Sequence, residues 1–217
     1  MVDNKSLFEK LLKKRKAFGG DKYLKQEIMF LIKKFQIKSI VETGTYLGDT
    51  TKEFSKLAKT YTIESNKKYY DLAKESLKEY NVEIFSGSSP KILKNILSKI
   101  EGPIIFFLDA HWNRYWPILD ELKVIAESGI KDSVIVIHDF HVPNKDFGYD
   151  SYYDNKNIIK YLLNIIDERF LGGKKKQKFD WEYIKNNILS INPKYNYYYN
   201  QKTEGDNRGV IFIIPEY

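Results

Sequence analysis

All three histidines of the chain stand beside aspartates at the ends of two apolar runs. The runs cover residues 104–108 and 134–137, and the polar residues that follow them are Asp109, His111, His138, Asp139 and His141. A carboxylate beside an imidazole can move protons, because histidine titrates near neutral pH. The same groups can bind Mg²⁺ or Mn²⁺. We therefore predict catalytic roles for Asp109, His111, Asp139 and His141, and metal ligation by Asp109, Asp139 and His138.

A glycine-containing segment, Glu42-Thr43-Gly44-Thr45-Tyr46-Leu47-Gly48, follows an earlier apolar run. Glycine directly after a strand lets the backbone come close to a ligand, and the second glycine leaves room at the entrance to the next helix. The acid before the loop favours a cationic guest over a pyrophosphate. Glu64 closes the next apolar run, twenty residues after Gly44. A carboxylate at that offset can accept hydrogen bonds from both ribose hydroxyls, so the segment predicts a nucleoside-cofactor site.

At these residues the chain resembles the class I S-adenosylmethionine-dependent methyltransferases. The resemblance runs from about Ser39 to the C-terminus and rests on Glu42-x-Gly44-x-x-x-Gly48, on the acids Glu64 and Asp109, and on a final hairpin. It implies that the first loop holds the methionine part of S-adenosylmethionine, that the second-strand acid holds the ribose, and that residues after the third strand flank the adenine. The cofactor-binding residues that we expect are Glu42, Gly44, Thr45, Tyr46, Gly48, Glu64, Ser65, Gly87, Ser88 and Asp109.

The segment around Asp109 also looks like the catechol O-methyltransferase branch of that family. In that branch, two strand-ending aspartates ligate a divalent metal, and Asp109 and Asp139 match them. The chain departs from the branch because Phe140 stands where the branch has an asparagine and because no lysine lies near Asn113. Ser88 stands where many members of the wider family have an acid. The resemblance implies methylation of an oxygen on a small hydroxylated molecule and leaves the requirement for a metal open.

The elements that would position these residues alternate along the chain. Short apolar runs begin near residues 39, 61, 82, 104 and 134, with polar stretches between them, and two further runs near the C-terminus predict an antiparallel hairpin. This alternation predicts an α/β fold: a Rossmann-like three-layer sandwich with a mostly parallel seven-stranded sheet, preceded by N-terminal helices. The helices that we expect after residue 38 cover 50–59, 67–80, 90–100, 116–127, 157–170 and 181–190.

Residues 1–38 carry the whole excess of positive charge. They hold eleven Lys/Arg against four Asp/Glu, whereas residues 39–217 hold twenty-five of each. Apolar residues at helical spacing predict two basic amphipathic helices separated at Gly19-Gly20. We therefore expect a basic helical extension over 1–38 and a cofactor-binding domain over 39–217, with a cap-like insertion around 144–180. Asn207-Arg208, in the last polar loop, could reach the same opening.

Composition limits the classes of function. The chain has 217 residues, enough for one domain, and its lack of cysteine excludes disulfides, thiolate metal sites and cysteine nucleophiles. No run approaches the ~20 apolar residues of a membrane helix, and the first residues lack an apolar signal core, so we expect a soluble, unprocessed, cytoplasmic chain. Two alternatives to a small-molecule methyltransferase stay open: an RNA methyltransferase that grips phosphates with its basic helices, and a binding or scaffold protein without turnover. Oligomeric state is also open.

Overall fold

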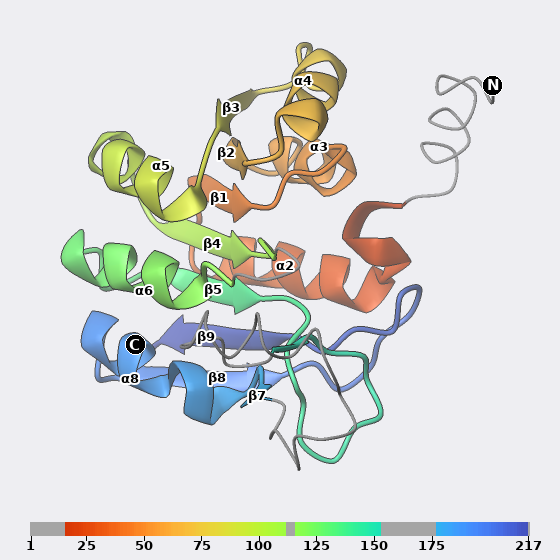
Figure 1. The fold of residues 1–217 in the computed structure, drawn as a ribbon. Coiled ribbons are helices and arrows are strands. Elements are labelled where there is room, and N and C mark those ends of the chain that lie inside the picture. The colour runs from red at the N-terminus through yellow and green to blue at the C-terminus, as the bar shows by residue number, and fades with distance from the viewer. Residues whose placement is uncertain (1–15, 112–115, 153–176, 217) are drawn as a thin grey trace, which may run out of the picture.

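The structure is a computed structural model that describes residues 16–111, 116–152 and 177–216. Within them a seven-stranded sheet has the order β3-β2-β1-β4-β5-β9-β8 (Figure 1). The first five strands in the chain pair in parallel, whereas β9 pairs antiparallel with both β5 and β8. The predicted sheet and its terminal hairpin are therefore confirmed. The strands are β1 Ser39–Thr43, β2 Lys59–Glu64, β3 Val82–Ser86, β4 Ile104–Leu108, β5 Val134–Ile137, β8 Tyr195–Tyr199 and β9 Ile211–Pro215.

Helices connect these strands close to the predicted positions. Helix α3 ends at Ser55 instead of residue 59 because pairing of β2 with β1 already begins at Lys59. None of the helices that the structure describes is both long and apolar enough to cross a membrane. The helix predicted at 157–170 and the first basic helix lie outside the described residues. The described helices are η1 Ala17–Gly20, α2 Lys22–Lys34, α3 Asp49–Ser55, α4 Lys67–Ser76, α5 Ser89–Ile96, η2 Leu97–Lys99, α6 Ile118–Glu127 and α8 Trp181–Ile191.

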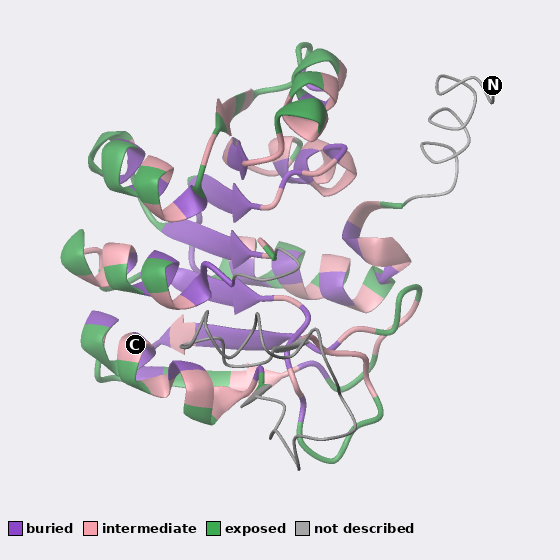
Figure 2. Ribbon diagram, viewed as in Figure 1, coloured by how far each residue is buried: buried purple, intermediate pink, exposed green. Residues whose placement is uncertain are grey.

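Two apolar clusters, one on each face of the sheet, create the three layers. Strand β4 shows the division, because Phe106 and Leu108 belong to the cluster with α5, α6 and α8, whereas Ile105 and Phe107 belong to the cluster with η1, α2 and α3. The central strands are buried along most of their length (Figure 2). A strand buried on both faces has apolar side chains in both directions, which explains why its sequence is a continuous apolar run.

Helix α2, the second predicted basic helix, packs against the sheet. Asp21 caps it by accepting hydrogen bonds from two backbone N–H groups of its first turn. Its buried face joins the second apolar cluster and is at most 2% exposed. The division of the chain at residue 38 stays a prediction. The residues of this buried face are Leu24, Ile28 and Leu31.

The predicted cap around 144–180 is described at its two ends. Strands β6 (Ser151–Tyr152) and β7 (Gln177–Lys178) form a separate two-stranded antiparallel sheet. Directly after β7, the ring of Phe179 packs against the rings of Trp116 and Phe140, with centroid distances of 4.5 and 5.0 Å. The segment therefore returns to the core beside the end of β5, while its role as a cap stays a prediction.

Candidate functional site

The carboxyl ends of the parallel strands share one edge of the sheet, where the strand order reverses between β1 and β4 (Figure 1). Ligands of open α/β sheets bind beyond such an edge. The predicted site residues divide there into two groups. One lies at the carboxyl ends of β1, β2 and β3, and we call it the cofactor side. The other follows β4 and β5, and we call it the acceptor side.

The two glycines after β1 are needed for contacts within the chain. Gly44 has a φ of +91°, and a Cβ atom at this position would lie 2.7 Å from the carbonyl oxygen of Asp109. Gly48 has a φ of +83°, and a Cβ atom there would lie 3.1 Å from the side chain of Leu77. Gly44 therefore lets the end of β1 come close to the end of β4. The close approach that the structure describes is to the protein backbone, and the expected approach to a ligand stays a prediction.

Glu42 is a buried acid surrounded by hydroxyl groups. It is 1% exposed, and its Oε2 accepts hydrogen bonds from Thr51 Oγ1 at 2.5 Å and from Thr62 Oγ1 at 2.6 Å. The hydroxyl of Thr45 lies 2.6 Å from that of Thr62 and extends the chain of hydrogen bonds. Burial raises the pKa of Glu42 to about 8, although the two hydroxyls oppose this shift. At neutral pH the group is thus largely protonated.

Glu64 ties the loop after β1 to the end of β2. Its Oε2 accepts a hydrogen bond from the backbone N–H of Tyr46 at 2.8 Å, and its Oε1 accepts one from Asn66 at 2.8 Å. Burial raises the pKa of Glu64, while backbone N–H groups, including that of Ser65, act in the opposite direction. Among the described residues, no Lys, Arg or His pairs with Glu64 or with Glu42. Both acids of the cofactor side therefore lack a cationic partner there.

The turn after β3 lies beside Glu64. The N–H of Gly87 donates to the backbone carbonyl of Glu64 at 2.9 Å. Ser88 occupies the N-cap position of α5 but makes no side-chain capping hydrogen bond. The structure thus brings the predicted cofactor residues of the first three strands to one edge. Their contacts with a cofactor stay a prediction.

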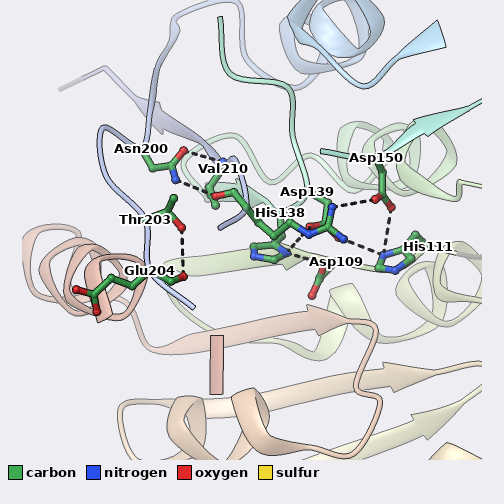
Figure 3. Close-up of polar contacts among 10 residues, drawn as sticks. Asp109, His111, His138, Asp139, Asp150, Asn200, Thr203, Glu204 and Val210 are labelled. Atoms are coloured by element: carbon green, nitrogen blue, oxygen red, sulfur yellow. Dashed lines mark hydrogen bonds and ion pairs between the residues drawn. The ribbon is translucent and has the colours of Figure 1, made fainter. Parts of the chain in front are cut away.

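On the acceptor side, five polar side chains point toward one another (Figure 3). His138 Nδ1 lies 3.1 Å from Asp109 Oδ1 and 3.2 Å from Asp139 Oδ1. Burial lowers the pKa of His138, but the two carboxylates outweigh burial and raise this pKa well above its ordinary value. His138 therefore lies between two carboxylates that favour its protonated form. The five residues are Asp109, His111, His138, Asp139 and Asp150.

Asp139 is held by three basic groups. It is 4% exposed and has a φ of +57°, a left-handed conformation that is uncommon outside glycine. Its Oδ1 lies 3.1 Å from Arg208 Nε, and its Oδ2 lies 3.7 Å from His111 Nδ1. Burial acts to raise the pKa of Asp139, but His138, Arg208 and His111 together lower it. Asp139 is thus an ionised carboxylate with its charge balanced inside the protein.

The structure does not bring His141 into this group. Its ring packs edge-on against the ring of Tyr149, with a centroid distance of 4.6 Å. Its backbone N–H donates to the carbonyl oxygen of Phe179 at 2.7 Å. In the described part of the chain, the side-chain contacts of the acceptor side thus involve His111 and His138 but not His141.

Comparison with known proteins agrees with this architecture. No protein-family model and no curated protein sequence matches the chain. An O-methyltransferase from Bacillus cereus, in complex with SAH, superimposes with a TM-score of 0.61 and 15% identity, covering 100% of this chain and 93% of that one. An O-methyltransferase from Streptomyces achromogenes that is involved in tomaymycin synthesis, in complex with SAM, gives 0.53 and 14%, covering 86% and 77%. The chain has the fold of the class I methyltransferases.

A similar fold also occurs in a protein that is named for a different reaction. A precorrin 8W decarboxylase from Methanobacterium thermoautotrophicum matches with a TM-score of 0.50 and 13% identity, covering 88% of this chain and 90% of that one. At such identities the likeness establishes the fold, and the chemistry must be argued from the site.

The predicted metal site of this methyltransferase fold does not fit a divalent ion well. Asp109, His111 and Asp139 offer ligand atoms within 4.8 Å of one another, but His138, a predicted ligand, is instead paired with both aspartates. Mg²⁺ and Mn²⁺ prefer oxygen ligands. The side chain of Phe140 has no oxygen and is fully buried. A metal would also have to share Asp139 with cations of the protein itself.

Glu121 is a site residue that sequence reasoning missed. It lies on α6, is 1% exposed and lines the same small pocket as Asp109, His111 and Asp139. Neither of its carboxyl oxygens makes a well-aligned hydrogen bond with a described residue. Burial raises the pKa of Glu121 to about 7. The sequence held a signal, because Glu121 is three residues after Ile118 and four before Ile125 on an otherwise apolar helix face.

Proposed function

We propose that the protein is an S-adenosylmethionine-dependent methyltransferase that methylates an oxygen of a small hydroxylated molecule. One observation carries the proposal: the buried acids Glu42 and Glu64 lie at adjacent strand ends without a cationic partner among the described residues. S-adenosylmethionine brings a sulfonium and an ammonium group, and its ribose brings two hydroxyl donors. A cation near Glu42 favours the ionised carboxylate, because opposite charges lower the pKa of an acid.

The acceptor side supplies what methyl transfer requires. A lone pair of the acceptor oxygen forms the new O–C bond, the S–C bonding electrons return to sulfur, and the sulfonium becomes a neutral thioether. The hydroxyl proton must pass to a base. We assign this role to His111, whose side chain is 51% exposed and whose Nδ1 faces Asp139 and Asp150, which leaves Nε2 to accept the proton. Asp109 lies between the two sides and positions both reactants.

The similar structures support the cofactor. The Bacillus cereus structure is a complex with SAH, the Streptomyces achromogenes structure is a complex with SAM, and both proteins are O-methyltransferases. We extend this cofactor and the oxygen acceptor to the present chain as part of the proposal. The proposal does not include a divalent metal, because Asp139 is already paired with His138 and Arg208 and because the side chain of Phe140 offers no ligand oxygen. The cytoplasmic location stays a prediction.

Proton release tests the proposal. We expect S-adenosylmethionine to bind more tightly as pH rises from 6 to 8, by up to about tenfold per pH unit, because Glu42 must lose its proton when the cation binds. Calorimetry in two buffers with different ionisation enthalpies measures the proton released. S-adenosylhomocysteine, which lacks the sulfonium charge, should release less. Binding that neither depends on pH nor releases a proton would remove the role of Glu42.

Two variants sharpen this experiment. Glu42→Gln keeps the shape of the side chain but has no proton to lose, so proton release should disappear. Glu83→Gln is the matched control, because Glu83 lies on strand β3 of the same sheet, where its exposed side chain pairs with Lys59. It should bind as the wild type does. If the wild type binds neither ligand, the scaffold alternative is favoured.

A further inference from the structure

The loop that carries Arg208 is fastened to the end of β5 through its backbone. The N–H of Phe140 donates to the carbonyl oxygen of Gly209 at 2.9 Å. The N–H of Gly209 donates to the carbonyl oxygen of Gly148 at 2.9 Å. The N–H of Gly148 donates in turn to Asn207 at 2.7 Å. A Cβ atom on Gly209 would lie 2.1 Å from the Phe140 oxygen. The position of Arg208 relative to Asp139, the residue before Phe140, is therefore fixed by the fold.

The guanidinium of Arg208 reaches two acids of the acceptor side. Its Nε lies 3.1 Å from Asp139 Oδ1, and its Nη1 lies 3.4 Å from Asp150 Oδ1. His111 Nδ1 faces the other oxygens of the same two acids, at 3.7 and 3.8 Å (Figure 3). The backbone N–H of Asp150 donates to the carbonyl of Asp139 at 2.8 Å, which holds the two acids together. Basic and acidic groups thus alternate around the site.

This arrangement places a permanent positive charge beside Asp139, one of the three residues whose ligand atoms could together hold a metal ion. Arginine stays protonated throughout the accessible pH range, so its charge does not depend on a bound ligand. Resting on the proposed function, we infer that Arg208 is the fixed cation of the acceptor site and that methyl transfer in this protein needs no divalent metal. The protein supplies through its C-terminal loop the charge that such an ion would bring.

A guanidinium selects a particular class of acceptor. It is planar and donates several N–H hydrogen bonds in a fixed fork, and its side chain here is 35% exposed, so part of it is accessible to a ligand. Such a group binds an oxygen that carries or develops negative charge. The acceptors that fit are small molecules with a second oxygen, a hydroxyl or a carboxylate, beside the hydroxyl that receives the methyl group.

Manganese binding tests the inference without knowledge of the acceptor. The electron paramagnetic resonance signal of free Mn²⁺ falls when the ion binds to a protein. We expect the wild type to leave this signal unchanged. Arg208→Ala removes the guanidinium from Asp139 and Asp150, and should bind Mn²⁺ at least about tenfold more tightly than the wild type, because a repelling unit charge is gone. Asp139→Asn added to Arg208→Ala should abolish the new site.

Two further variants keep the test decisive. Lys145→Ala removes an exposed positive charge from the same end of the molecule, where its Nζ contacts only the carbonyl of Gln201 in the described hydrogen bonds, and should behave as the wild type does. Arg208→Lys keeps the charge and should still exclude Mn²⁺. If thermal melting shows that Arg208→Ala is unfolded, Mn²⁺ binding by the wild type, by Arg208→Lys and by Asp139→Asn tests the inference instead. A wild type that binds Mn²⁺ stoichiometrically, and loses the ion in Asp139→Asn, overturns the inference.

The outcome of the Mn²⁺ experiment can be distinguished from the outcome of the test of the proposed function. S-adenosylmethionine affinity is measured on the same samples by calorimetry, and its site on the cofactor side does not include Arg208. Normal cofactor binding together with a wild-type Mn²⁺ site would refute the role of Arg208 while the methyltransferase proposal stood. Absence of cofactor binding would refute that proposal, whatever the Mn²⁺ spectra showed.

Discussion

The cofactor side and the acceptor side are both rich in buried acids, but they hold these acids in opposite ways. Glu42 is surrounded by neutral hydroxyl donors, and burial raises its pKa to about 8. Asp139 is buried to a similar extent, yet its pKa is lowered because His138 and Arg208 lie beside it. Burial alone thus does not decide the charge of an acid; the nearest donors do.

This contrast indicates which kind of ligand each side binds. An uncompensated buried carboxyl becomes favourable once a cation is bound, so the cofactor side suits a sulfonium. A carboxylate that is already paired gains little from another cation, so the acceptor side suits a neutral or anionic oxygen compound. The same edge of the sheet can therefore bind a positively charged methyl donor on the cofactor side and a neutral methyl acceptor on the acceptor side.

The largest expected effect comes from the point where the two sides meet. Gly44→Ala forces a left-handed residue to carry a Cβ atom that would lie 2.7 Å from the Asp109 carbonyl. We expect a loss of about 3 kcal/mol of unfolding free energy, from backbone strain together with displacement of β1 from β4. Urea denaturation measures it.

Gly129→Ala is the control for this substitution. Gly129 has a similar φ of +77°, but a Cβ atom there would meet nothing within 4 Å. It should lose only about 1 kcal/mol, the backbone part of the effect. Equal losses at the two glycines would show that the contact between β1 and β4 is not tight.

The second prediction concerns Glu121, a third buried acid, which lines the same pocket as Asp109, His111 and Asp139 on the acceptor side. Its pKa of about 7 lies above the ordinary value of 4.5. Between these pH values the folded protein keeps a proton that the unfolded chain has lost, so stability falls as pH rises through this window. Glu121→Gln lacks this proton and should gain on the order of 3 kcal/mol relative to the wild type between pH 4.5 and pH 8.

The measurement is urea unfolding at several pH values, with Glu127→Gln as control. Glu127 lies on the same helix, and its side chain is 53% exposed. Its difference from the wild type should stay flat with pH. A flat difference for Glu121→Gln as well would mean that water or a neighbouring hydroxyl solvates the carboxyl in the folded protein.

The sequence predicted the sheet well because its central strands are short continuous apolar runs. Residues 104–108 could be placed without knowledge of the fold, since a strand covered on both faces needs apolar side chains in both directions. Helix ends were predicted less well, as at α3, because the start of strand pairing decides where a helix must stop. The local sequence pattern therefore predicts where a buried strand lies, but it does not predict where a helix ends.

The site residues also divide into those that the local sequence pattern predicts and those that only the fold brings together. Glu42, Glu64, Asp109 and Asp139 all lie within two residues of a strand end, so the pattern located them. Asp150 stands in a stretch without periodicity, and it reaches the site through a backbone hydrogen bond to Asp139 and through contacts with His111 and Arg208. The pairing of Arg208 with Asp139 spans 69 positions of the chain, and the sequence suggested only that its loop could reach the opening. Contacts between distant loops depend on the whole fold.

The third prediction weakens the cofactor side alone. Glu64→Ala removes the carboxylate to which the ribose would bind, and we expect S-adenosylmethionine affinity to fall by about 1–3 kcal/mol. The acceptor side should keep its behaviour toward Mn²⁺, since Glu64 makes no contact with it among the described side chains. Calorimetry measures the affinity. An unchanged value would remove Glu64 from the cofactor site.

The smallest effect is expected outside both sides, where charges pair in solvent. Lys25 Nζ lies 2.6 Å from Glu53 Oε2, and the two side chains are 44% and 21% exposed. Lys25→Ala should cost no more than about 1 kcal/mol of stability, because water and salt screen such a pair. The same variant examines the RNA alternative. A lysine of α2 that already pairs with the domain should contribute little to phosphate binding, so retention of a single-stranded RNA at low salt should not change. A marked loss of retention would instead show that the basic helix contacts phosphates and would bring the RNA methyltransferase back as the leading function.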